Sequence, residues 1–95
     1  MITAKGLKEI ALTRRDSLVR ELLSYVEASI RSVAEKGGLE DTIYVNERYA
    51  FALSDVENVL RNLDYEVGLY MEDLETYPER EKWYFIISWG DVQLG

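Results

Sequence analysis

Hydrophobic positions between residues 18 and 33 recur at the spacing of an α-helix. The stripe consists of Leu18, Val19, Leu22, Leu23, Val26, Ile30 and Val33. A repeat near 3.6 residues predicts a helix with one apolar face. The Gly37-Gly38 pair that follows is a typical helix stop, and Lys36 is well placed in the last turn.

The first fifteen residues continue the helical spacing more weakly. Thr3 is a suitable N-cap, and Leu7 and Ile10 lie three residues apart behind it. The charged run Arg14-Arg15-Asp16 interrupts the stripe. The pattern therefore fits one helix of roughly 33 residues, or two helices with a new start at Asp16. In either case we expect residues 1–15 to project beyond the core.

A seven-residue spacing within this stripe allows two interpretations. Its members are Leu12, Val19, Val26 and Val33. The helix could pair with a second copy of itself, as in a short coiled coil, or lie on a sheet of its own chain. We expect intramolecular packing for residues 18–33 and an oligomer contact near the N-terminus. The candidate oligomer interface comprises Leu7, Ile10, Leu12 and Val19.

The remainder of the chain reads as strands around a short helix. Residues 42–45 and 65–70 have β-branched or aromatic residues in strand-like patterns. Between them Ser54 and Glu57 have the spacing of a capping box, which predicts a helix over about nine residues. Residues 71–82 are polar and contain the only proline, so we expect a loop. Residues 83–89 are apolar on both faces, which is typical of a buried central strand.

These elements predict a single α+β domain over residues 1–95. A helix joins the first two strands, so they should run parallel, whereas a loop alone joins the second and third, which should be antiparallel. With the apolar third strand in the middle, the fold is a two-layer αβαββ domain. It has one long and one short helix on a three-stranded mixed sheet of order 1-3-2. The other face of the sheet should stay partly open, and an uncovered aromatic face would be an interaction surface.

Composition excludes several chemistries. The chain has neither cysteine nor histidine, which removes disulfides, thiolate metal sites and the usual catalytic base. No Gly-rich phosphate loop or nucleophile motif is present. We therefore expect a protein that is not an enzyme and has no cofactor. With no long apolar run and no apolar leader at the start, we also expect no membrane association and a cytoplasmic location.

Charge and aromatic residues are distributed unevenly. Residues 1–38 carry seven Lys/Arg and five Asp/Glu, whereas residues 39–95 carry four and thirteen. Ten of the eleven aromatic residues also lie beyond residue 38. The acidic second part argues against direct nucleic-acid binding, since phosphate contacts need clustered Lys/Arg. It favours a protein partner with a basic surface.

The predicted loop is the most acidic segment and the first candidate site. Its candidate partner-binding residues are Tyr70, Glu72, Asp73, Glu75, Tyr77 and Glu79. One interpretation is a solvated turn that keeps the protein soluble. Another is an acidic finger that docks on a basic surface, with the tyrosines as anchors. A Ca²⁺ or Mg²⁺ site is a third, although the spacing matches no EF-hand loop.

A basic cluster on the long helix is the second candidate site. It contains Lys5, Lys8, Arg14, Arg15 and Arg20. It could be a solvated helix face, or it could contact the acidic half of another copy and give head-to-tail association. In an oligomer, Arg14, Arg15 and Arg20 could also form one pocket for a small nucleotide.

Three segments supply packing positions along most of residues 18–89: Ala34 to Gly37 before Ile43-Tyr44-Val45, Leu60 to Val67, and Ile87-Ser88-Trp89. In these positions the chain resembles small α+β proteins of tailed bacteriophages. In that family a glycine is usual where this chain has Asp64, so Asp64 must take a left-handed conformation or a different turn. The resemblance carries no catalytic residue across. It implies the cytoplasm of an infected bacterium, and roles as virion accessory proteins or as inhibitors of host and defence machinery.

From residues and resemblance together we expect a non-enzymatic, homo-oligomeric phage protein. It would bind and inhibit a host or anti-phage defence protein through its acidic, tyrosine-bearing surface. One alternative is a virion accessory protein, bound to capsid or tail through the projecting N-terminal helix. A nucleotide-sequestering oligomer is another.

Overall fold

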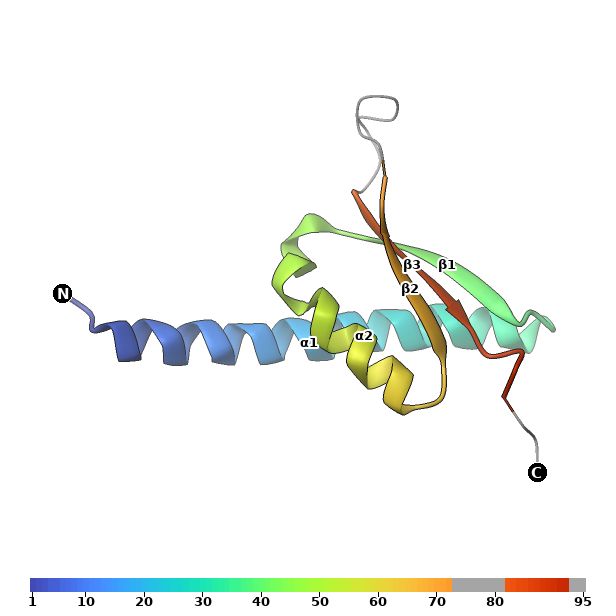
Figure 1. Cartoon of the computed structure of the whole chain (residues 1–95), viewed down its shortest axis with the longest axis horizontal. Helices are drawn as coiled ribbons and strands as arrows, with labels where there is room; N and C mark the ends of the chain where they lie inside the picture. The colour runs from blue at the N-terminus through green and yellow to red at the C-terminus, as the bar shows by residue number, and fades with distance from the viewer. Residues whose placement is uncertain (73–81, 93–95) are drawn as a thin grey trace.

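The computed structural model describes residues 1–72 and 82–92, and it is an α+β fold of two layers (Figure 1). Its elements are α1 (Ala4–Glu35), β1 (Glu40–Val45), the 3₁₀ helix η1 (Glu47–Ala52), α2 (Leu53–Asn62), β2 (Glu66–Met71) and β3 (Trp83–Ser88). The predicted αβαββ topology is confirmed. Because β3 pairs with both β1 and β2, the predicted strand order 1-3-2 is confirmed as well.

α1 is one continuous helix of 32 residues, not two. The Thr3 hydroxyl accepts a hydrogen bond from the Gly6 N–H at 3.0 Å, which satisfies one of the free amides of the first turn. At the other end the Val33 carbonyl accepts from the Gly38 N–H at 2.9 Å, and Gly37 has φ of 93°. This left-handed glycine ends the helix, as the sequence predicts.

Within the described residues, α1 packs against the rest of the molecule through its C-terminal part. Its buried residues are Leu18, Leu22, Val26 and Ile30, spaced four apart. They lie on the sheet of their own chain, so the intramolecular interpretation of residues 18–33 is confirmed. Figure 1 shows the N-terminal turns of α1 extending past the other elements. We call residues 4–15 the arm.

The sheet is antiparallel at every pair of neighbouring strands. β1 pairs with β3 from Glu40↔Ser88 to Val45↔Trp83, and β2 pairs with β3 from Glu66↔Ser88 to Met71↔Trp83. β1 and β2 thus run in the same direction, as expected for strands joined by a helix. Since β3 separates them, they form no parallel pair, and the description of the sheet as mixed is wrong.

The core lies between one face of the sheet and the helices. The buried side chains are Leu18, Leu22, Val26, Ile30, Ile43, Val45, Tyr49, Ala52, Leu53, Val56, Leu60, Phe85 and Ile87. Trp83, Trp89 and Tyr65 are partly buried and pack around this cluster. Burial of this apolar surface is the main stabilising contribution to the fold. Within the residues described, no helix is long and apolar enough to cross a bilayer.

η1 was not predicted, and it corrects the start of the second helix. Asn46 caps η1, since its side-chain oxygen accepts a hydrogen bond from the Arg48 N–H at 2.9 Å. α2 then follows directly and begins at Leu53, so Ser54 lies within its first turn. The predicted capping box of Ser54 with Glu57 is therefore wrong, because the chain already turns helically before Ser54.

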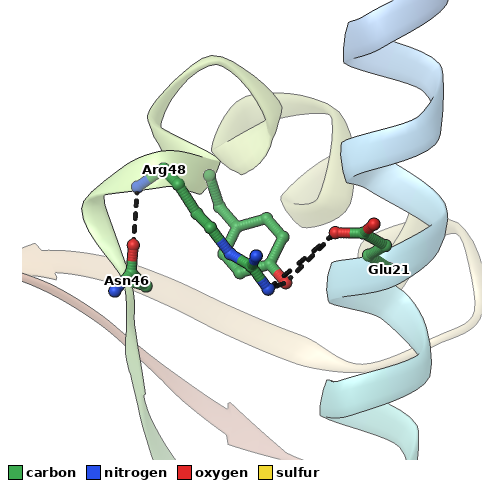
Figure 2. Close-up of polar contacts among 4 residues, drawn as sticks. Glu21, Asn46 and Arg48 are labelled. Atoms are coloured by element: carbon green, nitrogen blue, oxygen red, sulfur yellow. Dashed lines mark hydrogen bonds and ion pairs between the residues drawn. The ribbon is translucent and has the colours of Figure 1, made fainter.

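A polar cluster ties η1 to α1 (Figure 2). The Arg48 guanidinium lies over the ring of Tyr49, 4.6 Å from its centroid, and donates to the Tyr49 hydroxyl. The Tyr49 hydroxyl donates to the Glu21 carboxylate at 3.4 Å, and Arg48 lies 3.9 Å from the same carboxylate. With its ring buried and its hydroxyl at the helix surface, Tyr49 fixes the position of η1 on α1.

The end of α2 resolves the question posed by Asp64. Asp64 has φ of 72°, which is the left-handed conformation. The Leu60 carbonyl accepts from the Tyr65 N–H at 3.1 Å, and the Arg61 carbonyl accepts from the Asp64 N–H at 3.1 Å. These bonds close the helix in the manner usually assigned to glycine, so the first of the two predicted possibilities is confirmed.

Candidate functional site

The face of the sheet opposite the core forms a continuous accessible surface, which we call the open face. Side chains alternate along a strand, so the neighbours of buried Ile43, Phe85 and Ile87 point to this side. Its positions are Glu40, Thr42 and Tyr44 on β1, Tyr84, Ile86 and Ser88 on β3, and Glu66, Gly68 and Tyr70 on β2. They are exposed or half-buried although β3 is the central strand.

Three tyrosines cross the open face in one row. The register places Tyr44 of β1 and Tyr70 of β2 on either side of Tyr84 of β3. The ring centroids are 5.2 Å apart for Tyr44 and Tyr84, and 5.5 Å apart for Tyr84 and Tyr70. These are favourable aromatic contacts. Tyr44 and Tyr70 remain 40% and 47% exposed, so the row is an accessible aromatic surface.

Gly68 lets the end of this row lie flat on the sheet. A Cβ built at Gly68 would come within 2.5 to 2.8 Å of three atoms of the Tyr70 side chain, two in the ring and the hydroxyl oxygen, which is far closer than real contacts. The Tyr70 side chain therefore leans along β2 over the bare backbone of Gly68. Gly68, Ile86 and Thr42 are cross-strand neighbours and form a second row next to the tyrosines.

Carboxylates border the tyrosine row. The Tyr44 hydroxyl donates a long hydrogen bond of 3.4 Å to the Glu72 carboxylate just beyond the end of β2. At the opposite end of the face, Glu40 and Glu66 flank Ser88 and are both exposed. Lys82, next to β3, lies over the ring of Trp83 at 5.6 Å. The described part of this surface thus combines exposed tyrosines with a local excess of acid.

A shallow hollow opens between β2 and the end of α2. It is lined by Glu40, Arg61, Tyr65, Glu66, Val67, Gly68, Tyr70, Ile86 and Ser88. The Arg61 guanidinium pairs with Glu57 and donates to the Val67 carbonyl at 3.1 Å. Arg61 therefore covers part of the outer edge of β2, and the hollow keeps an acidic rim.

The structure divides the predicted acidic finger. Tyr70 and Glu72 lie at the open face, where Tyr70 belongs to the row and Glu72 accepts from Tyr44. Asp73, Glu75, Tyr77 and Glu79 lie outside the described residues. The finger thus stays a prediction beyond Glu72.

The residues of the predicted oligomer interface fall into two groups. Leu7, Ile10 and Leu12 lie on the arm and are 52%, 58% and 44% exposed. Val19 is half-buried and packs against the core of its own chain. Leu7 and Ile10, three residues apart, share one side of α1. The apolar surface available to a partner is therefore on the arm.

No family model, curated protein or solved structure matches this chain. The resemblance to phage proteins therefore stays a prediction. In the described residues there is also no group of three or more acidic side chains arranged to hold a metal ion.

The three arginines of the suggested nucleotide pocket do not converge within one chain. Arg14 and Arg15 are neighbours on α1 and project roughly 100° apart. Arg20, six residues after Arg14, projects roughly 120° away from it. A pocket built from all three would need side chains from more than one copy.

Sequence reasoning anticipated an open aromatic face but not the residues that form it. Of the three tyrosines in the row, the sequence indicates only Tyr70 as a candidate, because Tyr70 borders the acidic loop. The available signal was alternation, since Tyr84 has the opposite parity to Trp83 and Phe85 in the central strand. The register that aligns Tyr84 with Tyr44 and Tyr70 required the structure.

Proposed function

We propose that this protein is a non-catalytic binding protein that recognises a basic surface of a partner protein with its open face. The observation that carries the proposal is the row of Tyr44, Tyr84 and Tyr70, which spans all three strands and stays accessible. Tyrosine is enriched at interfaces and among hot spots, because it offers a large contact area with few rotatable bonds.

Charge sets the class of partner. The face carries Glu40 and Glu66 as exposed carboxylates, in a chain with a net charge of −7. Tyrosine rings attract cations through their π-electrons, and nearby carboxylates pair with the same cations. Arg or Lys side chains of the partner would lie on the rings and reach the glutamates.

The setting of this activity forms the rest of the proposal. The partner would be a host or defence protein of an infected bacterium, and binding would inhibit it. That step depends on the resemblance of the packing positions to phage proteins, and the geometry of the face supports only the binding itself.

Removal of single tyrosines tests the binding surface. A partner is first captured from infected cells with the tagged chain, identified by mass spectrometry and purified. We expect Tyr44→Ala and Tyr70→Ala each to weaken its binding about tenfold or more, as hot-spot residues do. Tyr25→Ala is the matched control, since Tyr25 is 55% exposed but lies on α1. Unchanged affinity in both row variants, with the fold intact by circular dichroism, contradicts the proposal.

A further inference from the structure

The arm carries the charge and the apolar side chains that the open face lacks. Residues 4–15 contain four Lys/Arg and one Glu, whereas the described open face has an excess of carboxylates. Leu7 and Ile10 of the arm are more than half exposed. A projecting helix of this length gains little stability by itself, because helices are stabilised mainly by packing of an apolar side. The arm therefore needs a surface to pack on.

We propose that the arm of a second copy of this chain docks on the open face. This inference rests on the proposed function, because it requires the open face to be a binding surface. It names one partner that this surface fits, namely a basic helix with apolar residues on the same side.

The dimensions of the two surfaces agree. Leu7, Ile10 and Arg14 are spaced i, i+3 and i+7, so they form one side of the arm about 10 Å long. On β3 the distance from the tyrosine row at Tyr84 to the acidic line at Ser88 is four residues, or about 13 Å. Leu7 and Ile10 can cover Tyr84 and Ile86 while the Arg14 guanidinium reaches the acidic line.

The acidic line offers two carboxylates to one guanidinium. Glu40 and Glu66 sit on either side of Ser88 in the register, and both are exposed. An arginine over the small Ser88 side chain would be within reach of one or both of them.

Charge argues against the simpler pairing of two arms with each other. Two arms side by side would bring Lys5, Lys8, Arg14 and Arg15 of both copies together, and like charges in contact are unfavourable. Docking of the arm on the open face brings opposite charges together instead. The contact joins different surfaces of the two copies. Two copies that exchange arms form a closed dimer, whereas copies that each bind a further copy form an open chain.

A charge swap tests this contact. The wild-type chain should self-associate in sedimentation equilibrium, and Arg14→Glu or Glu66→Arg alone should weaken association about tenfold or more. A mixture of the two variants should associate again as a heteromer, because the unchanged arm of the Glu66→Arg chain can bind the unchanged open face of the Arg14→Glu chain. In the other contact, the introduced carboxylate on the arm faces the introduced guanidinium on the sheet. Arg20→Glu and Glu35→Arg are matched controls that change the same charges elsewhere on α1 and should associate like the wild type.

Several outcomes would overturn the inference. They are a monomeric wild type at every concentration reached, single variants that associate like the wild type, and a mixture that fails to restore association. Arg14→Glu that strengthens association would indicate arm-on-arm pairing and would also overturn it. If Glu66→Arg does not fold, Glu66→Gln replaces it, with a smaller loss expected. If the wild type is monomeric but Tyr44→Ala still weakens binding of the purified external partner, the self-association is rejected and the proposed function stands.

Discussion

Two residues with unusual backbone or side-chain requirements shape the region around β2. Gly68 leaves room for the Tyr70 ring, so the end of the tyrosine row depends on a missing Cβ. Asp64 adopts φ of 72° in the turn that precedes β2. Each residue acts through its backbone conformation or its lack of a side chain, and neither buries apolar area. Gly68 determines where the Tyr70 ring lies, and Asp64 determines where β2 begins.

Replacing Asp64 by glycine should stabilise the protein. The left-handed region is sterically unfavourable for residues with a Cβ and unstrained for glycine. We expect Asp64→Gly to raise the free energy of unfolding by about 0.5–1 kcal/mol in urea titrations. Asp55→Gly is the comparison variant, because Asp55 lies in the first turn of α2, where glycine is a weaker helix former and the favourable negative charge is lost, so stability should fall. Destabilisation by both substitutions would show that the Asp64 side chain compensates for its backbone strain.

At the scale of elements, the sequence predicted the layers and the strand order well. The repeat near 3.6 residues reported α1, and the run of apolar residues 83–89 reported the central strand β3, because these patterns record which residues meet the core. η1 escaped prediction because its anchor is the contact of Tyr49 and Arg48 with Glu21, residues far apart in sequence. The tyrosine row escaped for the same reason, since cross-strand register is a tertiary property.

The two parts of α1 should contribute differently to stability, although the helix is continuous. Leu22 is buried, and Leu7 is on the arm. Leu22→Ala should therefore lower the free energy of unfolding by about 2–5 kcal/mol, as loss of a packed leucine does. Leu7→Ala, measured by the same thermal or urea unfolding at a dilute concentration, should change it by less than about 0.5 kcal/mol. A large effect of Leu7→Ala on dilute protein would mean that the arm packs within its own chain.

At the scale of the whole molecule, charge and shape act together. The longest extent is 54 Å, close to the length of α1 alone, so the basic arm lies far from much of the acidic surface. This separation prevents the two from neutralising each other locally. It favours association between copies over collapse within one, and it makes both the partner contact and the self-contact sensitive to salt.

The central position of β3 has a consequence for synthesis on the ribosome. Within the described sheet β1 and β2 each pair with β3 alone, yet β3 is the last of the three strands to be translated. Until it emerges, no strand ladder can form, and the apolar sides of α1, β1 and α2 lack Phe85 and Ile87. A nascent chain stalled before Trp83 should therefore be rapidly cleaved by protease, and one extended beyond Trp89 should be protected once it clears the exit tunnel. Equal protection of both would mean that the helices form a stable core before the sheet exists.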